Sequence, residues 1–439
     1  METLEEIAKG GQFSDGDWVE SKDQDPTGGV RLTQLADVGV GKFRDRSDRW
    51  LREDQAARLG CIFLKPDDVL VARMPDPLGR ACLVPGSIGR AVTVVDVAII
   101  RLSRSDIDPR YLMWALNAPL AQQQVVSMQS GTTRKRVSRK NLATVKIPIP
   151  LIEEQRRIVD ILEGHLSRLD AASIVLRNQM ARLAALRQSA LTNAHREVIA
   201  KGAGVASIGQ VATTDLGKML DAKRAAGAPT PYLRNINVRW GRFDLADVSD
   251  VPLSDHERKR FALAPGDLLV CEGGEPGRCA VWTGTERLMT YQKALHRVRV
   301  ERETMDPQFL ALMLEQVVRS GTADKFLTGT TIKHLPQEKL RRIEVPVPEL
   351  DAQQAVVARL SELEDAAGVL GGGIVGATQR AARLRRALLA AAFSGRLLGR
   401  SSDIETVEGF VNSERGWSPD AFGYHRPTDS ESPEGAYCG

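Results

Sequence analysis

One sequence pattern occurs twice in this chain of 439 residues, and the repeat restricts the folds that the chain can adopt. Residues 131–133, Gly-Thr-Thr, recur as residues 329–331, and the Pro-x-Pro motifs that begin at Pro148 and Pro346 are likewise 198 residues apart. Gln155 and Gln353 keep the same spacing. Because this period is far longer than the unit of any solenoid, each copy must be a whole domain with its appendage.

The first part of each copy has the pattern of a mixed α/β domain. Short β-branched runs at residues 69–72, 91–100 and 145–149 are bounded by Gly, Pro and Asp, and they predict strands. Residues 109–122 and 307–318 predict an amphipathic helix in each copy. We therefore expect two tandem mixed α/β domains of about 140 residues each, within the usual range of domain size.

The second part of each copy predicts a long helix with a heptad seam of apolar residues. In copy one the seam residues are Leu162, Leu166, Leu169, Leu176, Met180 and Leu183. In copy two they are Leu363, Ala367, Leu370, Ile374, Ala377, Ala381, Leu384 and Leu388. Nothing else in the sequence covers either seam, so we expect the two helices to pair. An antiparallel pair would place the two domains at opposite ends, and the predicted fold class is α+β with an antiparallel coiled-coil spacer.

Residues 371–373 of the second helix are all glycine, and each costs a helix roughly 1 kcal/mol relative to alanine. They predict either a kink or a close helix crossing, and the sequence leaves that choice open. The predicted organisation is a first domain at residues 1–150, a first spacer helix at 151–200, a second domain at 201–348 and a second spacer helix at 349–398. Residues 399–439 form an acidic tail rich in Ser, Gly and Pro, which we expect to be disordered.

Composition narrows the class of protein. Lys and Arg number 60 against 56 acidic residues, and this net charge of +4 permits nucleic-acid binding without requiring it. The five cysteines form no C-x-x-C pair, so we expect free thiols in a reducing cytoplasm and neither a zinc site nor a disulfide framework. The N-terminus lacks the pattern of a secretory signal, and no apolar run is long enough to span a membrane. We therefore expect a cytoplasmic protein with no membrane contact.

The duplicated order of strand, Pro-x-Pro motif and long helix resembles the specificity subunit of type I restriction-modification enzymes. The motifs that carry this resemblance lie at residues 147–159, 186–191, 345–354 and 391–397. The resemblance covers nearly all of residues 15–398. It implies two target recognition domains, each followed by a helix of an antiparallel spacer. The partners it implies are double-stranded DNA, two modification (methyltransferase) subunits docked on the helices, and restriction (translocase/nuclease) subunits.

No catalytic constellation is evident in the sequence. Residues 117–120, Asn-Ala-Pro-Leu, lack the second proline and the aromatic residue of a DNA amino-methyltransferase motif. No G-x-G-x-x-G motif opens a βαβ unit, and no P-loop is present. We therefore expect a non-catalytic chain with no metal and no cofactor of its own. The resemblance implies that S-adenosylmethionine, and ATP with Mg for restriction, bind to the partner subunits.

Both Gly-Thr-Thr loops are candidate DNA-binding elements. They combine a glycine hinge, hydroxyl groups and cations, which suit contact with phosphates and base edges. The recurrence of the loops in both copies favours DNA contact over a solvated helix face. For basic residues just beyond the loops, such as Arg139, the sequence supports the two interpretations equally. The candidate residues of the two loops are Thr132, Thr133, Arg134, Lys135, Arg136, Thr330, Thr331, Lys333 and His334.

A second candidate region in each copy is the loop after the first matched strand, at residues 73–80 and 272–278. The two loops differ in sequence while their flanks match, as expected for two domains that read different half-sites on one scaffold. Arg73, Arg80 and Arg278 are the candidates here. Arg80 and Arg278 either read guanine through two hydrogen bonds or stabilise a turn, and the sequence does not distinguish these roles.

Arg156, Arg157, Leu166 and Leu186 are the candidate positions at which the modification subunits dock on the helices. Two binding modules on one rigid spacer predict a split DNA target with an unread gap. The alternative hypothesis is a two-armed scaffold that binds proteins and no DNA, which the modest net charge allows.

Overall fold

The computed structural model describes residues 1–75, 77–131, 135–219, 227–284, 287–330 and 332–397. The chain forms two compact units: unit 1 combines residues 1–175 with the chain from residue 376 onward, and unit 2 is Leu176–Val375. The acidic tail predicted at residues 399–439 lies outside the described residues, so its disorder stays a prediction.

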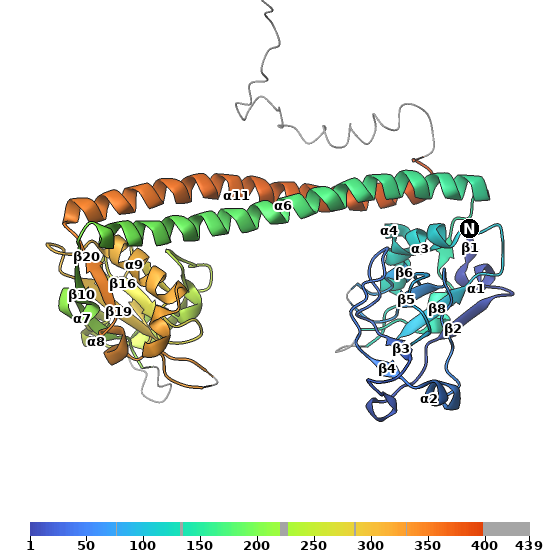
Figure 1. Ribbon diagram of the computed structural model, residues 1–439, viewed down its shortest axis with the longest axis horizontal. Helices are drawn as coiled ribbons and strands as arrows, with labels where there is room; N and C mark the ends of the chain where they lie inside the picture. The colour runs from blue at the N-terminus through green and yellow to red at the C-terminus, as the bar shows by residue number, and fades with distance from the viewer. Residues whose placement is uncertain (76, 132–134, 220–226, 285–286, 331, 398–439) are drawn as a thin grey trace, which may run out of the picture. The chain divides into compact units, whose positions relative to one another are not determined.

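The centre of unit 1 is a four-stranded antiparallel sheet, with a smaller sheet packed beside it (Figure 1). The run expected to be one strand at residues 91–100 is two strands in different sheets, because the chain turns between Val94 and Val97. The large sheet contains, in spatial order, β2 (Gln12–Asp15), β8 (Val97–Arg101), β5 (Val69–Ala72) and β6 (Ala81–Leu83). The small sheet contains β4 (Trp50–Leu51), β3 (Val30–Thr33) and β7 (Ala91–Thr93), and β3 and β7 are parallel.

The single helix predicted at residues 109–122 is wrong: two helices, α3 (Pro109–Asn117) and α4 (Pro119–Ser127), meet there. Pro119 has no N–H to continue α3 and disfavours the helical conformation of Ala118, which is extended. Asp108 caps α3 by accepting a hydrogen bond from the backbone N–H of Arg110. The remaining elements are β1 (Glu2–Thr3), α1 (Leu4–Ile7), α2 (Glu53–Arg58), α5 (Arg139–Ala143) and β9 (Lys146–Ile147).

Unit 2 repeats this architecture. Here the predicted helix is continuous as α9 (Pro307–Arg319), because Val317 stands where copy one has Pro119. The large sheet contains, in spatial order, β11 (Ala212–Leu216), β19 (Leu295–Val300), β16 (Leu268–Cys271) and β17 (Cys279–Val281). The small sheet contains β15 (Ser249–Leu253), β12 (Ala228–Leu233) and β18 (Thr290–Tyr291). The remaining elements are β10 (Gly204–Ser207), α7 (Ile208–Val211), β13 (Val238–Arg239), β14 (Arg242–Phe243), α8 (Asp255–Arg260), α10 (Gln337–Leu340) and β20 (Glu344–Val347).

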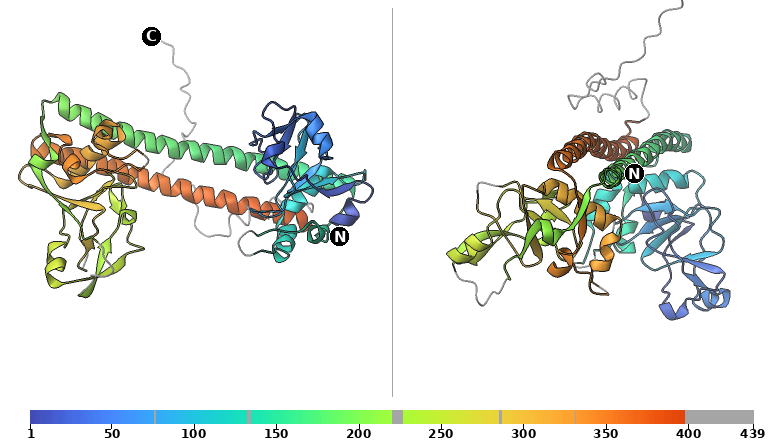
Figure 2. Two further views of the ribbon diagram at one scale, coloured as in Figure 1. Left: turned by 90° about the horizontal axis from the view of Figure 1, so that it is seen from below. Right: turned by 60° about the vertical axis from the view of Figure 1, so that its left-hand side comes forward.

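Two long helices, α6 (Ile152–Ala200) of 49 residues and α11 (Leu350–Phe393) of 44 residues, lie side by side in each unit (Figure 2). In unit 2, Arg187 pairs with Glu364 and Glu197 pairs with Arg359, so the two helices run in opposite directions. In unit 1, Arg385 of α11 pairs with Asp170 of α6. The predicted antiparallel helix pair is therefore confirmed.

The structure corrects two details of the helix prediction. α11 continues without interruption through residues 371–373, and an ideal Cβ on any of these glycines meets no atom within 4 Å. The predicted close helix crossing at the glycines is therefore wrong. Met180 and Leu370 of the predicted seam are largely exposed. In a pair of helices, each seam residue is covered by the partner helix on one side and stays open to solvent on the others. Leu162 and Leu388 are fully buried because a globular domain also covers the helices there.

The main core of unit 1 lies between the large sheet and the long helices. α3 packs on one face of the sheet and contacts α6 and α11 on its other side (Figure 1). The rings of Tyr111 in α3 and Phe393 in α11 are 5.2 Å apart between centroids. Phe309 of α9 and Leu360 of α11 belong to the equivalent core of unit 2. The loops of each domain therefore project from a scaffold that is anchored to the helices.

Candidate nucleic-acid interface

Each copy carries a hairpin loop at its Gly-Thr-Thr motif. In unit 1 the backbones of Ser130 and Arg136 exchange two hydrogen bonds of 2.9 Å, and in unit 2 Thr328 and His334 exchange two of 2.8 Å. Gly131 and Gly329 have φ angles of +93° and +91°, so each turn requires the left-handed region that favours glycine. The candidates Thr132, Thr133, Arg134 and Thr331 lie outside the described residues.

The hairpin and the loop after the first matched strand form one surface in each copy. The Val137 backbone N–H donates to the Arg73 carbonyl at 3.1 Å, and in unit 2 the Leu335 N–H donates to the Glu272 carbonyl at 2.7 Å. The two candidate regions that sequence reasoning treated separately are therefore hydrogen-bonded neighbours.

Arg80 is buried and not available to read a base. Its side chain is 4% exposed. The guanidinium donates to the carbonyls of Val38, Leu35, Met74 and Pro77 at 2.6 to 3.0 Å. The guanine-reading interpretation of Arg80 is contradicted, and its role is to hold the backbone at Met74 and Pro77 against the loop at residues 34–38.

Arg278 repeats this role in unit 2. Its guanidinium donates to the Asn235 carbonyl at 2.9 Å and pairs with Glu275 at 2.9 Å. The side-chain amide of Asn235 in turn donates to the Gly273 carbonyl at 3.0 Å. A third loop, at residues 234–238, therefore joins the surface formed by the hairpin and the loop after the first matched strand, as the loop at residues 34–38 does in unit 1. We call these three loops of each unit its recognition surface. Sequence reasoning missed this third loop, although the repeated valines Val38 and Val238 marked it.

Arg73 serves mainly to connect elements of unit 1. Its guanidinium pairs with Asp15 of β2 at 3.3 Å and donates to the Val95 carbonyl at 2.6 Å. The described candidates that remain exposed on the hairpins are Lys135 and Arg136 in unit 1 and Thr330, Lys333 and His334 in unit 2. The exposed cations among the described DNA-binding candidates therefore lie on the hairpins, whereas Arg73 and Arg80 are engaged within unit 1.

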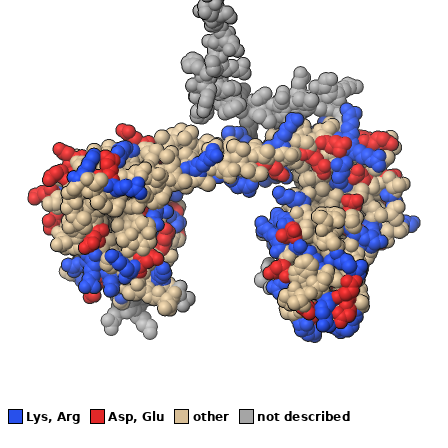
Figure 3. Space-filling view, in the orientation of Figure 1, with Lys and Arg blue, Asp and Glu red and all other residues tan. Residues whose placement is uncertain are grey.

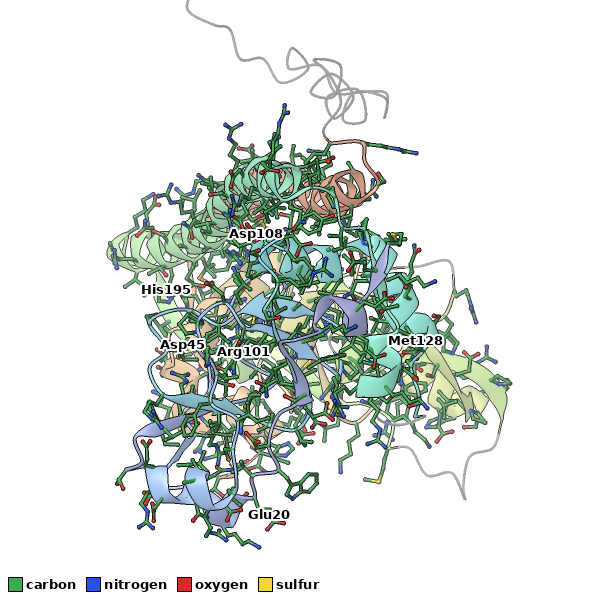
Figure 4. The ribbon with its side chains drawn as sticks, turned by 90° about the vertical axis from the view of Figure 1, so that its right-hand side faces the viewer. Glu20, Asp45, Arg101, Asp108, Met128 and His195 are labelled. Atoms are coloured by element: carbon green, nitrogen blue, oxygen red, sulfur yellow. The ribbon has the colours of Figure 1, made fainter. Side chains whose placement is uncertain are left out.

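A buried aspartate paired with a less buried arginine supports the large sheet of each unit in the same way. Asp68 of unit 1 accepts two hydrogen bonds from Arg101, and Asp267 of unit 2 accepts two from Arg299. These hydrogen bonds raise the pKa of both guanidinium groups. Figure 4 shows Arg101 in the middle of unit 1, between Asp108 beside the helices and Glu20 at the far end.

Gln155 and Gln353 have matching roles that sequence reasoning did not assign. Both are fully buried at the start of α6 and α11. Gln155 donates to the carbonyls of Asp106 and Pro150 and accepts from the Asp108 N–H, all at 2.8 to 2.9 Å. Gln353 makes the three equivalent bonds. Each glutamine therefore ties a long helix to the capped end of the domain helix before it.

The candidate docking positions on α6 divide into two groups. Arg156 and Arg157 are exposed, and Leu186 is 52% exposed, so these three side chains are accessible. Leu166 is only 3% exposed because it packs in the core of unit 1. Direct docking of a partner on Leu166 is therefore contradicted.

The described cysteines are free thiols with little reactivity. Burial raises the pKa of Cys82 to about 12 and that of Cys271 to about 11. Burial also raises the pKa of Cys279 far above its ordinary range. Among the described residues, no group of three or more His, Cys, Asp or Glu side chains is placed to bind a metal ion.

Charge on the visible face of each unit is mixed, with Lys and Arg interspersed among Asp and Glu (Figure 3). The exposed cations of the described hairpin residues are Lys135, Arg136 and Lys333. The part of the chain that the structure describes has no helix long and apolar enough to cross a membrane.

Comparisons with known proteins agree with this geometry. The family model for the type I restriction modification DNA specificity domain matches residues 80–175 and 205–369. The chain is 22% identical over 423 residues to the type I restriction enzyme EcoBI specificity subunit of Escherichia coli, covering 90% of this chain and 85% of that protein. It is 23% identical over 291 residues to the MjaVIII specificity subunit of Methanocaldococcus jannaschii, covering 62% and 68%.

Solved structures share the fold. A chain from a study of assembly and conformational transition in a type I R-M system superposes with a TM-score of 0.68 at 18% identity, covering 88% of this chain and 98% of that one. The HsdS subunit from Thermoanaerobacter tengcongensis gives a TM-score of 0.50 at 18% identity, covering 90% and 96%.

Proposed function

Because the chain belongs to the family of type I restriction modification DNA specificity domains, we propose that it selects the DNA target of a modification complex by binding one half of a split sequence with each unit. The observation that carries this proposal is the repeated recognition surface. In both copies a backbone hydrogen bond joins a glycine-turned hairpin to the loop after the first matched strand, and an arginine side chain joins that loop to a third loop. The scaffold is kept while the loop sequences differ, as two different half-sites require.

Exposed hairpin cations are the proposed DNA contacts. Lys135 and Arg136 in unit 1 and Lys333 in unit 2 stand on the hairpins without burial. Such cations contact phosphates and position the domain, whereas the loop side chains beside them read base edges. To address one face of the duplex, the two half-site centres would lie about one helical turn, roughly 10 base pairs, apart.

The chemistry is proposed to belong to partner subunits, with this chain non-catalytic in the cytoplasm. Two modification subunits would bring S-adenosylmethionine and the methyl-transfer site, and restriction subunits would bring ATP, Mg and cleavage. Arg156, Arg157 and Leu186 are accessible on α6 and are the positions at which we propose that the modification subunits dock.

The test is methylome sequencing of a host with and without this chain, in the presence of its active modification partner. We expect a split methylated motif that disappears when the chain is deleted. We also expect one half of the motif to change with the hairpin sequence of unit 1 and the other half to change with that of unit 2. An unchanged set of methylated motifs would contradict the proposal. The two-armed protein scaffold would then be the better hypothesis.

A further inference from the structure

Two large apolar side chains are exposed on the recognition surface of unit 2. Ile332, on the hairpin between Thr328 and His334, is 66% exposed, and Ile236, in the third loop, is 47% exposed. Burial of an isoleucine side chain is worth roughly 1.5 to 3 kcal/mol, so their exposure in the free chain leaves that gain available to a ligand.

Both isoleucines stand on loops that meet at Gly273. The side-chain amide of Asn235, next to Ile236, donates to the Gly273 carbonyl at 3.0 Å. Gly273 also forms an antiparallel bridge with His334 of the hairpin. The loops that carry Ile236 and Ile332 therefore belong to one surface.

The base of this hairpin is held in a defined position. Leu335, directly after the hairpin, donates its N–H to the Glu272 carbonyl at 2.7 Å, and its own carbonyl lies 2.8 Å from Nε2 of the buried His296. A Cβ on Gly273 would lie 3.0 Å from the His334 ring. The surface is therefore preorganised, which lowers the entropic cost of binding.

The positions of copy one that correspond to Ile236 and Ile332 do not carry large apolar side chains. In the third loop, Ala36 lies two residues before Val38 as Ile236 lies two residues before Val238. At the spacing of 198 residues, Arg134, outside the described residues, corresponds to Ile332. The two isoleucines therefore distinguish the half-site read by unit 2 from the half-site read by unit 1.

Readout of base edges favours the major groove. The base of the hairpin is one antiparallel pair, Thr328 and His334, whose backbones exchange two hydrogen bonds. The major groove of B-DNA presents a distinct pattern for each base pair, whereas the pattern in the minor groove is degenerate. The apolar group that base pairs present in the major groove is the thymine C5-methyl.

We propose that Ile332, together with Ile236, contacts thymine C5-methyl groups in the major groove of the half-site that unit 2 reads. This inference rests on the proposed function, because it assigns a readout to the surface that binds the DNA. Lys333 beside Ile332 would then serve the phosphate backbone.

The experiment measures equilibrium binding of the full chain, assembled with its modification partner, to its methylated-motif duplex. Each thymine is replaced in turn by deoxyuridine, which removes only the methyl group. Loss of one methyl contact is expected to weaken binding by roughly fourfold at one or more thymines, from the usual value of a buried methyl-sized group. In Ile332→Ala the replacement is expected to have no further effect at the thymine that Ile332 contacts. In Ile332→Val most of the effect of the replacement is expected to remain.

Leu288→Ala is the matched control. Leu288 is an exposed leucine of unit 2 that lies just before β18, and Ile236 lies just after β12. Because β12 and β18 are parallel, the two residues lie at opposite ends of the strand pair. Its deoxyuridine profile is expected to equal that of the wild-type chain.

Deoxyuridine effects that are equal in the wild type and Ile332→Ala at every thymine of the half-site would overturn the inference. If Ile332→Ala nevertheless weakens binding equally to the thymine and deoxyuridine duplexes, the result would indicate a side chain wedged between base steps. Absence of sequence-specific binding to any duplex would instead contradict the proposed function itself.

Discussion

Replacing Arg80 by methionine is expected to destabilise unit 1, and this variant tests the structural role of Arg80 directly. Methionine keeps most of the length of the side chain and removes the guanidinium. Four hydrogen bonds to the carbonyls of Val38, Leu35, Met74 and Pro77 are then lost. At about 1 kcal/mol net for each bond, the free energy of unfolding of unit 1 falls by about 4 kcal/mol.

The assay is urea unfolding of the purified full chain, followed by a probe in unit 1. With a typical slope of about 2 kcal/mol per molar urea, the midpoint for unit 1 is expected about 2 M lower in Arg80→Met. Arg49→Met is the control on the same unit. The Arg49 side chain is 53% exposed, so its replacement is expected to cost less than about 0.5 kcal/mol.

The result also separates the two roles that the sequence left open for Arg80. If Arg80→Met unfolds at the wild-type midpoint and yet one half of the methylated motif changes, then Arg80 acts on DNA and the structural reasoning is refuted. A large shift in the unfolding midpoint supports its role as a brace between two loops.

Three further perturbations follow from the same structure. Inserting seven residues after both Ala172 and Gly371 lengthens the helix pair by about 10 Å, so the gap of the methylated motif is expected to grow by about three base pairs with both halves unchanged. A gap of constant length in the methylome would refute the spacer as a ruler. Lys333→Ala is expected to lower the salt dependence of DNA binding by about one counterion, equally for all sequences, in titrations at several salt concentrations. An unchanged slope would exclude a phosphate contact. Burial lowers the pKa of His296, so below about pH 6.5 the unfolded chain takes up a proton that the folded chain does not. The stability of unit 2 should therefore fall toward pH 5, by up to about 1.4 kcal/mol per pH unit, and less steeply in His296→Leu. Equal slopes in urea titrations of the two proteins would rule out this contribution.

Much of the architecture is readable from the sequence because local patterns specify it. The spacing of 198 residues identifies two copies, and the heptad seams identify two long helices that must cover each other. The break at Pro119 was also available from the sequence, since a proline removes the N–H that a helix interior needs. The prediction of one helix at residues 109–122 gave too little weight to this residue.

The recognition surface depends on contacts between loops that are distant in the sequence. Arg80 reaches the Leu35 carbonyl across 45 positions, and no local pattern states whether an arginine after a turn faces solvent or a carbonyl cluster. The same applies to Leu166, whose place in the heptad seam was predicted but whose cover by the globular domain was not. Local sequence determined the copies, the strands and the helices of this protein through periodicity and turn chemistry. Tertiary packing alone decided which side chains of its loops are exposed to a ligand, because burial depends on what the rest of the chain brings against them.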